Sequence, residues 1–228
     1  MPVVVLVVIA MLVGIHGLLW LLGPDWQVWS LYALSFIPAR LLGPEAIAAP
    51  TGASIWTFFT YGFLHGDWTH VMFNSMWMLV FATPVARRLG AVRTLVCLSV
   101  AVLAGSAAML PLHWGEFLII VGASGAVSGA MAAAMPIMYS ARFDRSLTNL
   151  NHLRVVPFGE LIKDTRALGF TALFFGMQLI TGAVQASSTT AFLNERSIAW
   201  EAHVGGFIAG LIAFYILDRY RTSTLRFM

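Results

Sequence analysis

Two serines and three glycines stand close together in VGASGAVSG, residues 121–129, at the start of an apolar run. A serine hydroxyl becomes an effective nucleophile only when a neighbouring base accepts its proton. Histidine is the usual base, because its neutral imidazole titrates near working pH. His203, in another apolar run, is of the right type to serve Ser124, whereas helix packing explains Ser128. These residue types point to acyl transfer by a serine nucleophile.

Acyl transfer also needs hydrogen-bond donors aimed at the developing oxyanion. His70 and Asn74 are four residues apart and share one face of a helix, so both could point at that oxygen. The backbone N–H of Ser124 is a third candidate, since the first N–H groups of a helix lack partners. Glu201 is two residues from His203 and would face elsewhere on a helix. We therefore expect a Ser–His dyad.

The composition indicates the setting in which these residues work. Only 10% of the 228 residues are charged, against about 25% in soluble domains, which is typical of a membrane protein. Cys97 is the single cysteine, so no disulfide framework is expected. The sequence predicts one all-α membrane domain over residues 1–228.

Six segments are apolar enough to cross a membrane, which takes about 20 residues. They are residues 2–22, 68–86, 92–112, 118–138, 167–186 and 199–217. The first loop, residues 23–67, is too broken to span, and its tryptophans suit a partly helical segment at the membrane interface. A long loop, residues 139–166, carries basic residues together with Phe158 and Leu161, which predict either a cytoplasmic surface helix or a site for an unidentified partner.

The basic residues predict the orientation. All of the 13 lysines and arginines except Arg40 and Arg196 fall on the side of the membrane that holds both termini. By the positive-inside rule that side is cytoplasmic. The basic pI therefore reflects topology, and nucleic acid is excluded as a partner.

This topology places four polar residues at one depth. The second, fourth and sixth spans all run inward, and His70, Asn74, Ser124 and His203 lie within about 10 Å of their outer ends, at 1.5 Å per residue. Polar side chains within spans are costly, so they normally face the bundle interior and mark function.

Two GxxxG motifs predict close approach of the fourth and sixth spans. Gly125 and Gly129 follow the serine, and Gly206 and Gly210 follow the histidine. Such motifs let helix backbones come near each other. Gln178, a polar residue of the fifth span, is expected to form an interhelical hydrogen bond.

Three motifs in the chain resemble those of the rhomboid intramembrane serine proteases. They are GASG at 122–125, HGDWTHVMFN at 65–74 and AHVGGFIAG at 202–210. They occur in the family's order on the second, fourth and sixth spans, so the likeness covers most of the chain.

The resemblance implies that Ser124 is the nucleophile and His203 the general base. It also implies that His70 and Asn74, with the Ser124 amide, form the oxyanion hole. His65 is expected to bridge a loop and a helix near the site. The glycine and alanine before Ser124, Gly122 and Ala123, would leave room for a scissile backbone and its oxyanion.

The resemblance further implies transmembrane protein substrates in the lipid bilayer, cleaved near their outer ends, and no cofactor or metal. A multi-pass protein of a bacterial plasma membrane is expected, with the loop from Gln185 to Trp200 capping a water-filled cavity. Family members often carry an aromatic ring where this chain has Ser128, so Trp200 or Tyr61 could support His203 instead.

Three alternatives compete with this interpretation. A metal site from His65, His70 and His203 is disfavoured for two reasons. His65 and His70 are five positions apart, about 140° around a helix, so they do not share a face, and the metalloprotease motif HExxH is absent. A transporter or channel predicts inverted repeats or discontinuous helices, which the sequence does not show. An inactive rhomboid-like protein that binds helices without cutting them stays open, although such relatives usually lose the serine or histidine kept here.

Overall fold

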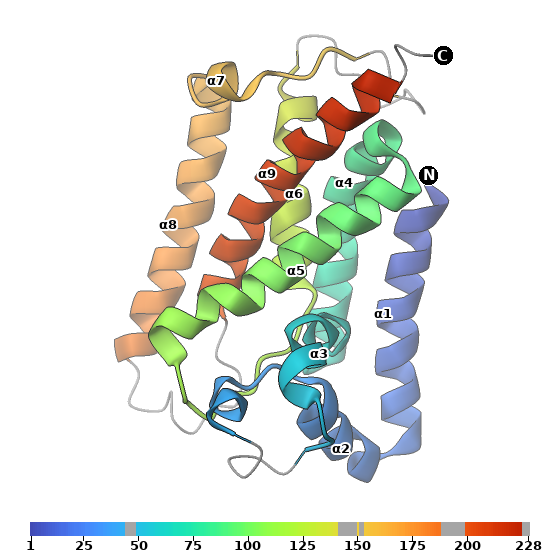
Figure 1. The fold of residues 1–228 in the computed structure, drawn as a ribbon, viewed down its shortest axis with the longest axis vertical. Coiled ribbons are helices and arrows are strands. Elements are labelled where there is room, and N and C mark those ends of the chain that lie inside the picture. Colours follow the sequence, from blue (N-terminus) through green and yellow to red (C-terminus); the bar gives the residue numbers. More distant parts are fainter. Residues whose placement is uncertain (44–48, 141–149, 151–152, 188–198, 225–228) are drawn as a thin grey trace.

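The computed structural model describes residues 1–43, 49–140, 150, 153–187 and 199–224. Within these residues the chain is helical and has no β-strand. Its elements are α1 Val3–Leu22, α2 Pro24–Leu34, the 3-10 helix η1 Pro38–Leu42, α3 Ala53–Thr60, the 3-10 helix η2 Tyr61–Phe63, α4 Trp68–Leu89, α5 Ala91–His113, α6 Ser124–Met138, α7 Phe158–Leu161, α8 Thr165–Ser187 and α9 Trp200–Thr224. The long helices stand together as a bundle (Figure 1).

Hydropathy agrees with an all-α membrane bundle. Helices α1, α5 and the first 20 residues of α9 are long and apolar enough to cross a membrane, and α6 is a shorter apolar helix. Large hydrophobic side chains are exposed along α1, α5 and α9, as expected where lipid is the solvent. Figure 1 places the start of α1 and the end of α9 at the same end of the bundle.

Helix α6 begins at Ser124, not near residue 118 as expected. The preceding segment is extended, because its backbone pairs with the first loop. Phe36 N donates to Ile120 O at 3.1 Å, and Ile120 N donates to Phe36 O at 2.9 Å. Helix α9 also runs further than the expected span, to Thr224.

The first loop folds into α2, η1, α3 and η2, which gather at the end of the bundle opposite the termini (Figure 1). Arg40 of η1 is buried and donates to the carbonyl oxygens of Tyr32 and Ser35 at 2.6 and 2.9 Å. Trp56 Nε1 donates to Ala33 O at 2.8 Å and ties α3 to α2. The loop is therefore held by its own hydrogen bonds, and it lies where α4, α6 and α9 begin. In the 139–166 loop, the surface helix predicted around Phe158 and Leu161 is present as α7.

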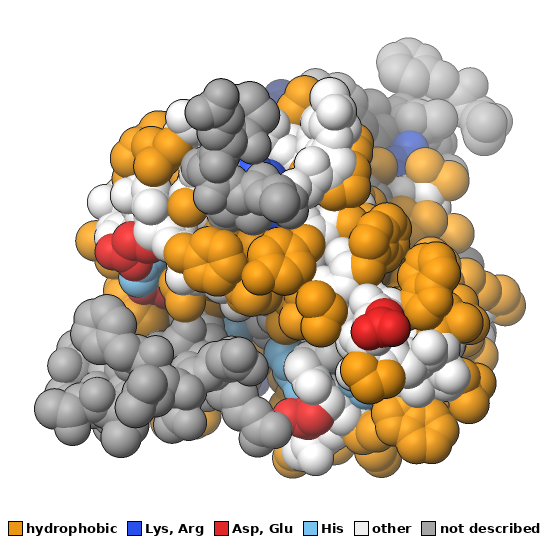
Figure 2. All heavy atoms as spheres, turned by 90° about the horizontal axis from the view of Figure 1, so that it is seen from below, with side chains coloured by type: hydrophobic (Ala, Val, Ile, Leu, Met, Phe, Trp, Pro, Cys, Tyr) orange, Lys and Arg blue, Asp and Glu red, His pale blue; other side chains and the backbone are white. Residues whose placement is uncertain are grey.

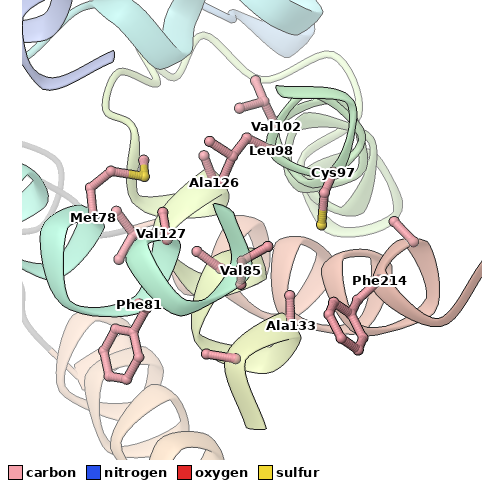
Figure 3. Packing of buried hydrophobic residues seen from close by; sticks show 14 of the residues in the cluster. Met78, Phe81, Val85, Cys97, Leu98, Val102, Ala126, Val127, Ala133 and Phe214 are labelled. Atoms are coloured by element: carbon pink, nitrogen blue, oxygen red, sulfur yellow. The ribbon is translucent and has the colours of Figure 1, made fainter. Parts of the chain in front are cut away.

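Helix α6 is the centre of the bundle. Nearly all of its residues are buried, and nine of the fifteen are alanine, glycine or serine. Figure 3 shows Ala126, Val127 and Ala133 of α6 among side chains of α4, α5 and α9. Small side chains allow three helices to approach the fourth closely, so packing fixes the position of Ser124 at its end.

The two GxxxG faces meet between α6 and α9. A Cβ built on Gly206 would lie 2.2 Å from Gly125 O, and one built on Gly210 would lie 2.3 Å from Gly129 Cα. Both distances are far below van der Waals contact, so only glycine fits at either position.

The bundle is clamped at the end that carries the termini. Arg88 of α4 binds both carboxylate oxygens of Asp218 of α9, at 2.7 and 3.0 Å. The same guanidinium donates to the carbonyl oxygens of Leu150 and Leu153 at 2.8 and 2.7 Å. Arg88 is 4% exposed, so this ion pair is buried. Helix α8 lies at the edge of the bundle, away from this ion pair, and packs on α9 (Figure 1).

Candidate active site

Ser124 is the first residue of α6, and its side chain is partly exposed. The N–H groups in the first turn of a helix have no partner within it and point outward from the helix start. In the described part of the chain, the Ser124 N–H has no backbone hydrogen bond. Hydroxyl and amide therefore lie together at a helix terminus that favours negative charge.

The turn before Ser124 is fixed from two sides. Gly122 N donates to Tyr61 O at 3.1 Å, and Ala123 N donates to His65 Nε2 at 3.4 Å. Burial, with the neighbouring His70 and His16, lowers the pKa of His65 to about 3. The ring is thus neutral at ordinary pH and can accept this hydrogen bond.

Glycine is required at position 122 for two reasons. Its φ of +123° is a conformation that side chains rarely adopt. A Cβ there would also lie 2.7 Å from His70 Cε1 and 2.8 Å from His70 Nε2, and 3.7 Å from Ser124 Oγ. The His70 ring edge and the serine hydroxyl therefore share the space beside Gly122.

His70 and Asn74 lie in the first two turns of α4. Asp67 caps this helix by accepting from His70 N at 2.8 Å, which fixes where the helix begins. Asn74 is 5% exposed, and its Nδ2 has no hydrogen-bond partner among the described residues. A buried amide donor without a partner is costly and rare in folded proteins.

His203 lies in the first turn of α9 and is partly buried. Its Nδ1 is 2.9 Å from Gln178 Oε1 of α8, so the expectation of an interhelical bond from Gln178 is confirmed. Among the described ring contacts, none joins His203 to Tyr61 or Trp200. The hydroxyl of Tyr61 instead donates to Val102 O at 2.9 Å.

Ser124 and His203 are brought together by their helices. A Cβ built on Gly125 would lie 3.5 Å from Ala202 O, so the residue after the serine meets the residue before the histidine. In the described residues no hydrogen bond joins Ser124 Oγ to the imidazole. Catalytic hydrogen bonds often form only once a substrate is bound.

Glu201 takes no part in holding His203. His113, the last residue of α5, faces Glu201 Oε1 with Nε2 at 2.9 Å and Glu116 Oε2 with Nδ1 at 2.7 Å. The expectation that Glu201 faces away is confirmed, and a carboxylate on α9 is engaged with α5.

The histidines do not form a metal centre in the described residues, where no group of three or more His, Cys, Asp or Glu could hold an ion. The His65 and His70 rings are 5.0 Å apart and steeply inclined to each other. Figure 2 views the molecule from the end that carries α2 and α3, where histidine side chains reach the surface between hydrophobic ones. The predicted cap, residues 185–200, falls largely on residues 188–198, outside the described residues.

Gln178 is the residue whose partner sequence reasoning did not identify. Its signal was a polar side chain in an apolar helix, but the identity of its partner depends on how α8 and α9 are aligned. Ser128, by contrast, is buried within α6 as its packing interpretation requires.

Comparison with models of protein families matches residues 52–220 to the rhomboid domain. A comparison with curated proteins finds no significant match. The match covers α3 to α9 up to residue 220, and thus every residue of the site.

Proposed function

The chain belongs to the rhomboid family of integral membrane proteins, which are generally intramembrane serine proteases, and we propose that it is an active endopeptidase that uses Ser124 and His203. The observation that carries this proposal is the convergence beside Gly122. The nucleophilic hydroxyl, the His70 ring edge and the start of α6 meet there. The hydroxyl and the helix start belong to one segment, and the His70 ring comes from another that is far from it in sequence. Each is a part that acyl transfer needs.

The proposed reaction begins with proton transfer from Ser124 Oγ to His203 Nε2. The oxygen attacks the scissile carbonyl carbon, and the carbonyl electron pair moves to the oxygen as a tetrahedral oxyanion. When the intermediate collapses, the C–N bond breaks and His203 gives its proton to the departing amine. Water then attacks the acyl-enzyme with His203 again as base, which releases the acid and restores Ser124.

The oxyanion would be held by three donors. The Asn74 Nδ2 group is a buried amide without a partner among the described residues, and an incoming oxygen would supply one. His70 and the Ser124 N–H complete the set at the start of α6. Donors fixed in advance cost no reorganisation when charge develops.

The substrates we propose are transmembrane segments, cut near their outer ends. Helical backbone in lipid resists opening, because its polar groups have no other partners there. The site lies beside the starts of α4, α6 and α9. At that depth it would meet a substrate helix where the substrate frays toward water. We place six spans and one domain in residues 1–228, both termini in the cytoplasm and the first loop in the outer leaflet. A bacterial plasma membrane is the location we propose.

Active-site labelling and substrate cleavage test this function. A serine-reactive fluorophosphonate should label the wild type, which should also cleave a model transmembrane substrate in detergent or liposomes. Ser124→Ala should abolish both, whereas Ser128→Ala, one turn along the same helix, should keep both. A wild type that binds the substrate without cutting it would favour the non-catalytic rhomboid-like alternative. Full activity in Ser124→Ala would refute the mechanism.

A further inference from the structure

One side-chain hydrogen bond joins α8 to the candidate base. Gln178 Oε1 lies 2.9 Å from His203 Nδ1. An amide oxygen only accepts hydrogen bonds, so Nδ1 of the neutral ring carries the proton. Nε2 then keeps its lone pair, as a base for the serine requires. The contact therefore selects one of the two imidazole tautomers.

Aromatic stacking sets the alignment that makes this contact. The Phe174 and Phe207 rings stack with centroids 4.5 Å apart and planes inclined by 23°. Gln178 follows Phe174 by four residues and His203 precedes Phe207 by four, so each pair lies on one helix face. Because α8 and α9 run antiparallel (Figure 1), the stack and the hydrogen bond are successive contacts of one interface.

The other groups that could orient this ring are engaged elsewhere. Glu201 faces His113, and the hydroxyl of Tyr61 donates to Val102 O. In the described residues, the His203 side chain has no hydrogen bond besides that to Gln178.

We propose that Gln178 is a positioning residue for catalysis, which holds His203 with its proton on Nδ1 and its lone pair on Nε2. This inference rests on the proposed function, because it takes His203 as the base. When Nε2 accepts the serine proton, the ring becomes an imidazolium and its Nδ1–H bond to the amide oxygen strengthens. When Nε2 returns a proton to the leaving amine, Nδ1 keeps its own. The edge helix α8 thus contributes directly to the state of the base.

Two substitutions separate this role from simple packing. Gln178→Met has similar length but no acceptor. By analogy with metal-binding histidines that lose their second hydrogen-bond partner, it should lower kcat by about 10–100-fold, with KM unchanged. Gln178→Glu restores the acceptor and adds a charge that stabilises the imidazolium. Its kcat should recover at high pH, and the acidic limb of its pH profile should move up by about 1–3 pH units.

The other groups near His203 stay constant in this comparison. His70 of α4 acts on it electrostatically, Glu201 of α9 is bound to His113 of α5, and α6 carries no titratable residue. Thr181→Val on α8 is the matched control, because the Thr181 hydroxyl bonds Met177 O of its own helix at 2.9 Å. It should leave kcat and the pH profile unchanged.

A measurement independent of activity completes the test. Nitrogen NMR of isotope-labelled histidine, assigned with His203→Ala, should show His203 as the Nδ1–H tautomer in the wild type and as a mixture in Gln178→Met. A wild-type tautomer and wild-type kcat in Gln178→Met would overturn the inference. If the wild type neither cleaves nor labels, the proposed function fails, while the tautomer shift still reports whether Gln178 orients the ring.

Discussion

Replacing Gly206 by alanine tests whether the α6–α9 contact positions the catalytic pair. The new Cβ would lie 2.2 Å from Gly125 O, 2.9 Å from Gly125 C and 3.0 Å from Gly125 Cα. All three atoms are backbone, so no side chain can turn aside to make room. The helices must separate until the shortest distance is normal, which requires a displacement of about 1 Å.

That displacement acts directly on the site. Ser124 adjoins Gly125, and His203 lies one turn before Gly206. A misplacement of about 1 Å costs roughly 100-fold in rate, so kcat/KM for a transmembrane substrate should fall by that factor. Overpacking should also lower the free energy of unfolding by about 1–3 kcal/mol.

Two controls separate misalignment from loss of the fold. Gly210→Ala makes a similar clash, at 2.3 Å from Gly129 Cα, but one turn further from the site. It should lose comparable stability and less activity. Gly169→Ala on α8, where a Cβ meets nothing within 4 Å, should change neither. Cleavage and fluorophosphonate labelling should be measured below the unfolding temperature of each variant. Wild-type kcat/KM in Gly206→Ala would refute the claim that this contact aligns the pair.

Three further outcomes follow from other parts of the molecule. Asn74→Ala should raise the barrier to cleavage by about 2–4 kcal/mol with little loss of stability, and an unchanged rate would exclude Asn74 from the oxyanion hole. Arg88→Met removes the partner that binds both oxygens of Asp218, and the free energy of unfolding in mixed micelles should fall by about 3–5 kcal/mol. Exposed Arg154→Met should have little effect, and equal losses in both variants would contradict the buried clamp. Burial lowers the pKa of His65 in the folded protein to about 3, whereas in the unfolded chain it is about 6.5. Between pH 3 and about 6.5 the unfolded chain therefore binds more protons than the folded one. The free energy of unfolding should drop as pH falls through this range. At pH 5 the loss from this group is about 2 kcal/mol, and His65→Gln, which cannot titrate, should lack that part of the pH dependence.

Local patterns in the sequence were sufficient to predict most of the helices, and they suggested the chemistry that we propose for the site. Apolar runs of about 20 residues mark α1, α5 and α9, because the bilayer selects length and hydropathy, both of which are local properties. The predicted segments 68–86 and 167–186 also correspond to helices, α4 and α8. Paired GxxxG motifs predicted that α6 and α9 would touch, because only glycine permits backbone contact. The residue types of Ser124, His203, His70 and Asn74 predict acyl transfer, the reaction proposed for this site.

The start of α6 could not be predicted from its own residues. Residues 118–123 are apolar and read as the first turns of a span, yet Ile120 pairs with Phe36 of the first loop. That pairing satisfies both backbone groups of Ile120 without a helix, and the N–H groups of Gly122 and Ala123 bind Tyr61 and His65. The choice between the two conformations depends on a partner more than 80 residues away in sequence.

The remaining decisions also belong to tertiary structure. The sequence by itself determined which side chains are available, at what depth and on which helices. Only the assembled bundle decided three features. His113 binds Glu201, Asn74 Nδ2 lacks a partner in the described residues, and Gln178 is hydrogen-bonded to His203. Hydrogen bonds require alignment within a fraction of an ångström. That alignment is set by the packing of whole helices against one another, which no single segment encodes.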